Sequence, residues 1–275
     1  MSNCKVIALT NQKGGVGKTT TAVNLGVGLV QQGKKVLLID ADAQANLTMA
    51  LGYSRPDDIP ITLSTMMQSI IDDKAFDVSQ GILHHHEGVD LLPSNIELSG
   101  FEVRLINAMS RERVLKTYVN EVKKNYDYVL IDCMPSLGMI TINALAAADS
   151  VVIPTQPHYL SAKGLELLLR SVSMVKRQIN PKLRIDGILM TMVMPRTNIS
   201  KEITASVKSA YGQRIKVFDT EIPHSIRAVE ATAEGKSIFA YDKSGKVAAA
   251  YEQLGKEVAE IGEKQRTQNR ADRIR

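Results

Sequence analysis

Residues 13–20 read KGGVGKTT, a combination of glycine, lysine and threonine that suits phosphate binding. Glycines let backbone N–H groups converge on anionic oxygens, and a helix that starts at such a loop adds its positive end. Lys18 is placed to reach the β- and γ-phosphates, the Thr19 hydroxyl to ligate Mg²⁺, and Thr20 to contact the α-phosphate. The alternative is a flexible turn that happens to be basic. We predict a phosphate loop with the binding residues Lys13, Gly14, Gly15, Val16, Gly17, Lys18, Thr19 and Thr20.

Acidic residues follow two apolar runs further along the chain. Asp40 and Asp42 come after the run 36–39, and Asp132 follows the run 128–131. Continuous apolar runs are typical of buried parallel strands, and the carboxyl ends of such strands form the crevice where these sheets bind ligands. An acid in the position of Asp132 can hold Mg²⁺ through a bound water. For Asp40 and Asp42 the alternative is N-capping of the next helix, although capping requires only one acid.

Alternating strands and helices must position these residues. Apolar runs predict strands at 6–9, 36–39, 89–93, 128–131, 151–154, 185–192 and 215–218. Periodic apolar positions predict helices from 18 to about 33 and at 63–71, 101–124, 140–148, 161–179, 200–211 and 247–261. No linker or internal repeat interrupts this order. We therefore predict an α/β fold in a single domain at 1–263, a doubly wound, mostly parallel sheet with helices on both faces, followed by a basic tail at 264–275.

The composition excludes several classes of protein. The 275 residues are 44% hydrophobic, enough for one sizeable core. No apolar run approaches the ~18 residues of a transmembrane helix, the first residues lack a signal-peptide core, and the two cysteines give no disulfide framework. These features predict a cytoplasmic protein. The lack of Trp and the 4% aromatic content argue against recognition of single-stranded nucleic acid by base stacking.

Charge is concentrated at the C-terminal end. The segment 264–275 holds five basic residues and one acid, so it carries +4 of the net charge of +5. Any surface for a polyanion in the rest of the chain must therefore be a local patch. The run His84–His86 lies in a polar stretch. Because three adjacent histidines do not share a helix face, we expect an exposed loop there rather than a metal site.

The phosphate loop departs from the ordinary GxxxxGK[ST] pattern. Thr10 stands where the first glycine would be, and Lys13 lies inside the loop. This resembles the deviant Walker A motif xKGGxGK[ST] of the ParA, MinD and nitrogenase iron-protein class. In that class the additional lysine reaches across a dimer to the partner's nucleotide, and Lys13 matches its position. The alternative is a solvated surface lysine.

Further segments narrow the resemblance to the ParA/Soj family of partition ATPases, over roughly residues 5–261. They are Asp40-x-Asp42-x-Gln44-x-Asn46, the block LIDCMPSLG at 130–138, the run 141–145, Thr191-Met192, Arg196-Thr197-Asn198 and Ile222-Pro223. Ala43 and Met134 stand where the family usually has proline, and His224 replaces a frequent arginine. No helix-turn-helix segment precedes the loop, so binding to a specific operator is not implied.

The resemblance implies ATP and Mg²⁺ as cofactors and a role for each matching residue. Lys13, Lys18 and Asp42 would be the catalytic residues, with Asp42 positioning or deprotonating the attacking water. Thr19, Asp40 and Asp132 would hold the metal and its water shell. Met192 and Pro223 match the base-binding positions, although they could be plain core residues. Arg196 and Arg227 match DNA-contacting arginines, and for Arg227 the alternative is a helical ion pair with Glu230.

The implied function is DNA partition. An ATP-bound homodimer would bind double-stranded DNA non-specifically at the nucleoid, and a ParB-type centromere-binding protein would trigger hydrolysis and release. A MinD-like membrane-cycling regulator is one alternative, but it needs an amphipathic C-terminal helix, and Ile274 is the single large apolar residue after Gly262. A cluster-bridging redox ATPase is another, but it needs suitably placed cysteines. Plasmid-copy or conjugation regulators with the same loop are a third. We expect no membrane partner.

Overall fold

The computed structural model describes residues 4–274, of which 159–163, 266 and 268–274 are described by their backbone alone. Its centre is a seven-stranded sheet with the strand order β3-β4-β2-β5-β1-β6-β7. All neighbouring strands are parallel except β3, which pairs antiparallel with β4. The strands are β1 Lys5–Leu9, β2 Val36–Ala41, β3 Leu83–His84, β4 Asp90–Leu92, β5 Tyr128–Cys133, β6 Ser150–Thr155 and β7 Arg184–Met190.

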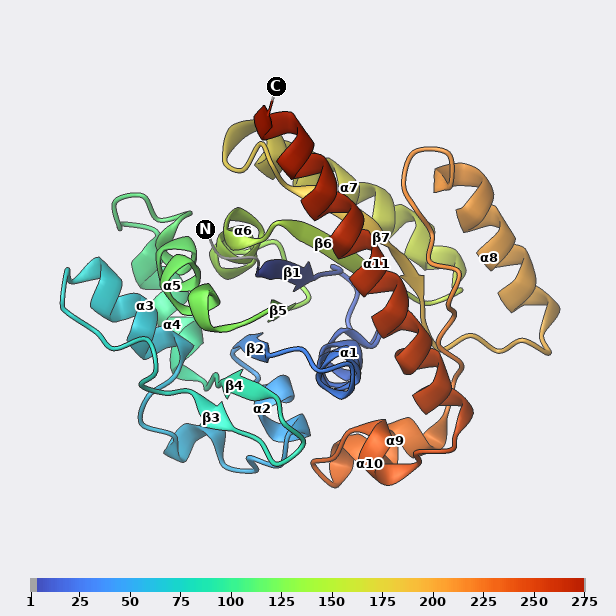
Figure 1. Cartoon of the computed structure of the whole chain (residues 1–275), viewed down its shortest axis with the longest axis horizontal. Coiled ribbons are helices and arrows are strands. Elements are labelled where there is room, and N and C mark those ends of the chain that lie inside the picture. The colour runs from blue at the N-terminus through green and yellow to red at the C-terminus, as the bar shows by residue number, and fades with distance from the viewer. Residues whose placement is uncertain (1–3, 275) are drawn as a thin grey trace.

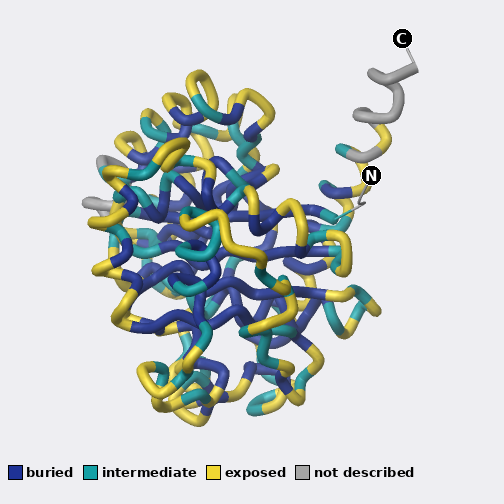
Figure 2. Tube along the Cα trace, turned by 90° about the vertical axis from the view of Figure 1, so that its left-hand side faces the viewer, coloured by how far each residue is buried: buried dark blue, intermediate teal, exposed yellow. Residues whose placement is uncertain are grey.

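Helices cover both faces of this sheet, as Figure 1 shows. They are α1 Lys18–Gln31, α2 Asn46–Ala50, α3 Leu63–Ile71, α4 Glu97–Leu105, α5 Val114–Val122, α6 Met139–Ala147, α7 Tyr159–Gln178, α8 Asn198–Tyr211, α9 Ile226–Ala233, α10 Ile238–Tyr241 and α11 Lys246–Ile274, with 3₁₀ turns at Pro56–Asp58 and Lys123–Asn125. Val6 and Ala8 of β1 pack in the core with α3 to α8, whereas Ile7 and Leu9 pack with α1, α2 and α9 to α11. Strands β1, β2, β5 and β6 are therefore buried on both faces, which explains their apolar runs, whereas the short edge strand β3 is not buried (Figure 2). The predicted fold class is confirmed.

The predicted helix over 101–124 was wrong, because the chain forms two helices there. Ser110 has a φ of 51°, which an α-helix does not accommodate. Asn143 of α6 holds the new start of α5: its side-chain amide donates to Arg111 O at 2.7 Å, and its Oδ1 accepts from Leu115 N at 3.1 Å. A side chain from a different helix thus satisfies backbone groups that a continuous helix would have paired internally.

Other elements also differ from the predicted ones. The segment 215–218 makes only an isolated bridge between Val217 and Ile188, and β7 ends at Met190, two residues early, because Met192 has a φ of 52°. Helices α9 and α10 were not predicted. Helix α11 continues without a break through the predicted basic tail. Most basic side chains of that tail lie outside the described residues.

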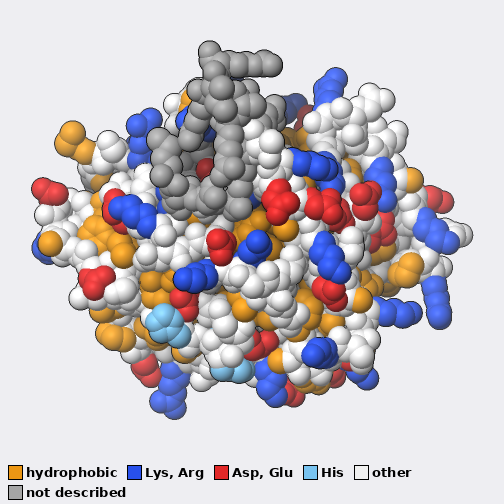
Figure 3. Space-filling model, in the orientation of Figure 1, with side chains coloured by type: hydrophobic (Ala, Val, Ile, Leu, Met, Phe, Trp, Pro, Cys, Tyr) orange, Lys and Arg blue, Asp and Glu red, His pale blue; other side chains and the backbone are white. Residues whose placement is uncertain are grey.

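Two surface properties bear on function. No helix among the described residues is long and apolar enough to cross a membrane. On the face shown in Figure 3, Lys and Arg side chains are interspersed with Asp and Glu. On this face the charges therefore form no broad region of one sign.

Candidate functional site

The predicted phosphate loop connects the carboxyl end of β1 to the start of α1. Gly15 and Gly17 adopt left-handed backbone conformations, with φ of 71° and 80°, which favour glycine. Gly17 is the N-cap residue of α1, and Thr21 N donates to its carbonyl at 2.9 Å. A Cβ built on Gly14 or Gly15 would meet no atom within 4 Å, so the backbone of this loop is open to an approaching anion.

Side chains at the ends of neighbouring strands hold the loop in place. Asn11 donates to Pro154 O at 2.7 Å and accepts from Lys13 N at 3.1 Å. Gln156 donates to Gly15 O at 2.7 Å. These contacts fix the loop from β1 and β6. Sequence reasoning missed Asn11 and Gln156, although each is a polar residue shortly after a strand, at the edge where ligands bind.

The two lysines of the loop have different surroundings. Lys18 is buried and directs its Nζ to Lys13 O at 3.5 Å. Burial lowers the pKa of Lys18, and the nearby carboxylates of Asp132 and Asp42 oppose this effect. Lys13 is half-buried, and its Nζ donates to Gln156 Oε1 at 3.4 Å. Lys18 therefore faces the interior of its own loop, while Lys13 lies against the end of β6.

Asp132 and Thr19 meet at the start of α1. Thr19 Oγ1 donates to Asp132 Oδ2 at 2.6 Å. Asp132 is 1% exposed, and among the described residues no donor reaches its other oxygen, Oδ1. Burial, together with the charge of Asp40 on the adjacent strand, raises the pKa of Asp132 to about 8. A buried carboxylate oxygen without a partner, next to a hydroxyl, is a donor set that fits Mg²⁺.

Asp40 is held more completely than Asp132. Its carboxylate accepts from Thr48 N at 2.8 Å, from Thr48 Oγ1 at 2.7 Å and from Asp42 N at 3.2 Å. It is fully buried, and burial raises its pKa to about 7. Asp40 therefore ties the end of β2 to α2. Its carboxylate could contribute to a metal site only in addition to these hydrogen bonds.

Asp42 follows β2 directly, at the same carboxyl end of the sheet. It is 8% exposed, and its Oδ1 accepts from Gln44 N at 3.0 Å. The N-cap residue of α2 is Ala45, with a φ of 52°, so Asp42 closes a short turn before the helix and does not cap it. The acid is near enough to Lys18 and Asp132 to influence both of their pKa values.

The two predicted base-binding residues lie on adjoining loops. Val193, which follows Met192, forms a parallel bridge with Pro223. Met192 Cε is 3.8 Å from the place where a Cβ on Gly17 would lie, which puts Met192 beside the phosphate loop. A cavity of about 450 Å³ adjoins Pro223. Its lining includes Val193, Pro195, Thr220, Ala250 and Gln253.

The two predicted DNA-contacting arginines differ in their contacts. Arg196 is exposed on the connection between β7 and α8. Arg227, in the first turn of α9, is 63% exposed and forms an ion pair with Asp242 at 2.9 Å. The alternative partner, Glu230, instead accepts a hydrogen bond from Tyr241 Oη at 3.1 Å. The pairing that the local sequence suggested is therefore replaced by one with an acid that follows α10.

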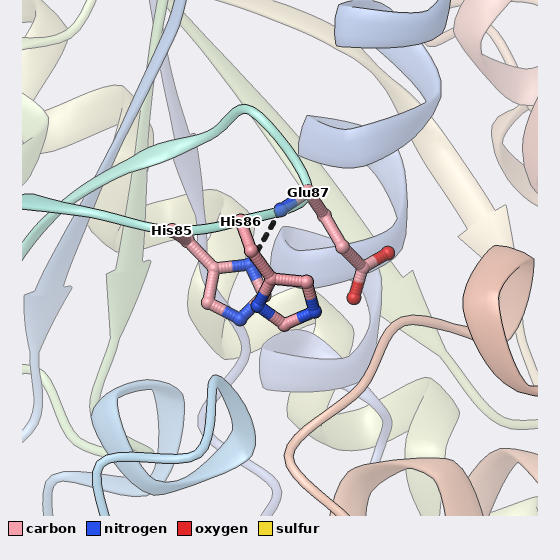
Figure 4. A group of neighbouring side chains, drawn as sticks. All are labelled: His85, His86 and Glu87. Atoms are coloured by element: carbon pink, nitrogen blue, oxygen red, sulfur yellow. Dashed lines mark hydrogen bonds between the residues drawn. The ribbon is translucent and has the colours of Figure 1, made fainter.

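Two residues of the histidine run, His85 and His86, form a compact cluster with Glu87, shown in Figure 4. One ligand atom from each of His85, His86 and Glu87 can be chosen so that all lie within 4.8 Å of one another. Two of these groups are already in use, because His85 Nδ1 accepts from Glu87 N at 3.3 Å and the Glu87 carboxylate accepts from Ser237 N at 2.9 Å. His85 is buried, contrary to the expectation of an exposed loop, whereas His84 and His86 are exposed. The hydrogen bond of Glu87 to Ser237 gives this residue a structural role at the start of α10.

Comparisons with known proteins agree with the site. Residues 4–185 match the family model for an AAA domain. The chain is 45% identical to the sporulation initiation inhibitor protein Soj of Bacillus subtilis over 258 residues. The matched region covers 94% of this chain and 99% of that protein. It is 38% identical to the chromosome partitioning protein ParA of Caulobacter vibrioides, over 92% of this chain and 93% of that protein. Among solved structures it is similar to a cobyrinic acid a,c-diamide synthase from Mycobacterium smegmatis with bound ATP analog and magnesium, with a TM-score of 0.80, 34% identity, and coverage of 92% of this chain and 93% of that chain.

The strand–loop–helix unit, the buried acid at the end of β5 and the parallel sheet define a P-loop ATPase. Both sequence relatives cover nearly the whole chain, well beyond the segment that carries the loop. The chain belongs to the ParA/Soj family of these ATPases.

Proposed function

We propose that this chain is a nucleotide-switched partition ATPase of the cytoplasm, associated with the nucleoid. ATP closes two copies of the chain across two nucleotides, the closed homodimer binds double-stranded DNA without sequence preference, and a ParB-type centromere-binding protein stimulates hydrolysis and release. The different placement of the two loop lysines carries this proposal. Lys18 folds into its own loop, while Lys13 lies at the end of β6, where it can serve a second nucleotide.

The residues at the loop divide the chemistry among them. Lys18 and the open backbone at Gly14 and Gly15 bind the phosphates. Thr19 and Asp132 hold Mg²⁺, which neutralises charge on the phosphates when it is bound. Asp42, directly after β2, orients or deprotonates the attacking water. Met192 and Pro223 contact the base.

DNA binding would come from arginines that the closed dimer brings together in two copies. Arg196 and Arg227 are both exposed, and an arginine can donate two hydrogen bonds to one phosphate. A few contacts from one copy are weak, whereas a dimer doubles the number of neutralised phosphates. Binding should therefore depend on ATP and fall steeply with salt.

The decisive experiment is a gel shift on an arbitrary DNA duplex with ATP, with ADP and without nucleotide. Retardation with ATP alone is the expected result. A parallel assay with liposomes of anionic phospholipid tests the MinD-like alternative. ATP-dependent binding to liposomes without binding to DNA would overturn the partition function in favour of membrane cycling.

A further inference from the structure

Helix α6 begins without a side-chain cap of its own. It starts at Met139, directly after the loop 134–138 that follows β5, the strand that carries Asp132. Its N-cap residue is Gly138, which has no side chain to accept a hydrogen bond from the first turn. The first N–H groups of a helix have no partner within the helix, so an acceptor must come from elsewhere.

Glu102 of α4 supplies that acceptor. Ile140 N, in the first turn of α6, donates to Glu102 Oε1 at 3.2 Å. A carboxylate is favourable at this position because the N-terminus of a helix carries partial positive charge. The contact ties α4 to the far end of the loop that follows β5.

Gly138 provides the space for this carboxylate. A Cβ built on Gly138 would lie 2.2 Å from Glu102 Oε1 and 3.1 Å from its Cδ. The backbone at Gly138 has φ −67° and ψ −179°, an extended conformation that any residue adopts. A Cβ at this position would therefore displace the Glu102 carboxylate, whereas the backbone itself would accept any residue.

We infer that Glu102 is a positioning residue for ATP hydrolysis, and that Gly138 leaves the space that its carboxylate occupies. The loop 134–138 is then held on both sides, by the Thr19–Asp132 hydrogen bond at the end of β5 and by Glu102 at the start of α6. Between these points Pro135 and Ser136 are exposed. Loss of the second anchor leaves the groups around the phosphates less well placed, which impairs the chemical step more than binding. The inference rests on the ATPase activity and not on DNA partition.

Four variants test this role. Glu102→Ala should lower kcat for ATP hydrolysis about tenfold while KM for ATP changes less than about twofold. Glu102→Gln keeps an acceptor oxygen and should recover most of kcat. Gly138→Ala should reproduce the loss by displacing the carboxylate. Glu97→Ala, which removes an exposed acid from the same helix, should leave kcat unchanged.

The double variant Glu102→Ala, Gly138→Ala gives the sharpest result. If the two residues act as one unit, adding Gly138→Ala to Glu102→Ala should cost no further activity. If Gly138→Ala lowers kcat by the same factor in both backgrounds, the glycine has another role and the inference fails. Hydrogen exchange provides a readout without turnover: the Ile140 amide should exchange faster in Glu102→Ala and in Gly138→Ala, with a cooperative thermal unfolding transition as evidence of folding. Unchanged exchange in both variants would also overturn it.

Discussion

Thr19 and Asp132 are joined by a hydrogen bond of 2.6 Å that links the first turn of α1 to the end of β5. The bond uses only one carboxylate oxygen and leaves the other buried, with no donor among the described residues in reach. This bond joins the start of α1, directly after the phosphate loop, to the buried acid of β5. The role of each residue at this site in ATP binding, dimerisation and hydrolysis can be tested separately.

Lys18→Ala should weaken ATP binding by tenfold or more, because it removes a charge-assisted contact with the phosphates. Isothermal titration calorimetry with ATP measures the change. Lys35→Ala, an exposed lysine just before β2 and thus at the opposite edge of the sheet, is the matched control and should bind as the wild type does. Equal affinity in all three proteins would contradict the assignment of the loop.

Asp42 should affect turnover but not binding. Asp42→Asn can keep the turn contact with Gln44 N while losing the charge. We expect ATP to bind and the dimer to persist on size exclusion, with hydrolysis at least about 100-fold slower. If Asp42→Asn hydrolyses ATP at the wild-type rate, the residue serves the turn and does not act on water.

Lys13→Ala should behave differently from both. Because Lys13 is proposed to act on the partner's nucleotide, the monomer should still bind ATP, while ATP-dependent dimerisation and hydrolysis should fall together. Analytical ultracentrifugation with ATP and a phosphate-release assay measure the two effects. A variant that dimerises and hydrolyses normally would make Lys13 a surface lysine.

The raised pKa of Asp132 predicts a pH-dependent stability of the metal-free protein. The pKa of Asp132 is about 8 in the fold, against 3.8 for an ordinary aspartic acid, so the native state holds a proton that the unfolded state has lost between about pH 4 and pH 8. Stability should therefore fall as pH rises through this window. Asp132→Asn resembles the protonated acid, so in EDTA it should raise Tm by several degrees at pH 9 and by little at pH 5. The same difference at both pH values would show that the buried charge is not the cause.

The arginines should control the salt dependence of DNA binding. Each single variant, Arg196→Ala or Arg227→Ala, should flatten the plot of log affinity against log salt concentration, because each removes phosphate contacts. The double variant should lose DNA binding but keep ATP-dependent dimerisation. Asp242→Asn is an informative companion, since it releases Arg227 from its ion pair and should strengthen DNA binding modestly. A slope that stays unchanged in both single variants would place the phosphate contacts elsewhere.

Much of the fold could be predicted because its signals are local. The unit around Lys18 consists of an apolar run, glycines and a periodic helix, all contiguous in the chain. Strands β2 and β5 are buried on both faces, so they are continuous apolar runs that end at Asp40 and Asp132. The site residues at the ends of these strands then follow from the geometry of a parallel sheet.

The parts that could not be predicted depend on contacts between distant residues. The break between α4 and α5 depends on Asn143, which belongs to another helix. Asn11 and Gln156 donate to backbone carbonyls, which every residue has, so the sequence does not show which residues they contact. Arg227 pairs with Asp242, beyond the reach of the helical spacings from which ion pairs are inferred.

The bracing of the α4–α5 connection determines where the chain can accept extra length. Arg111 donates from Nη1 to Ile106 O at 2.7 Å, and its own carbonyl is held by Asn143. Residues 107–110 thus form a short loop that the Arg111–Ile106 hydrogen bond closes, and Met109 in this loop is 95% exposed. A peptide inserted there would extend into solvent and leave both helices in place. The same peptide at 112–113 would separate Arg111 from Leu115, and Asn143 could then hold only one of them.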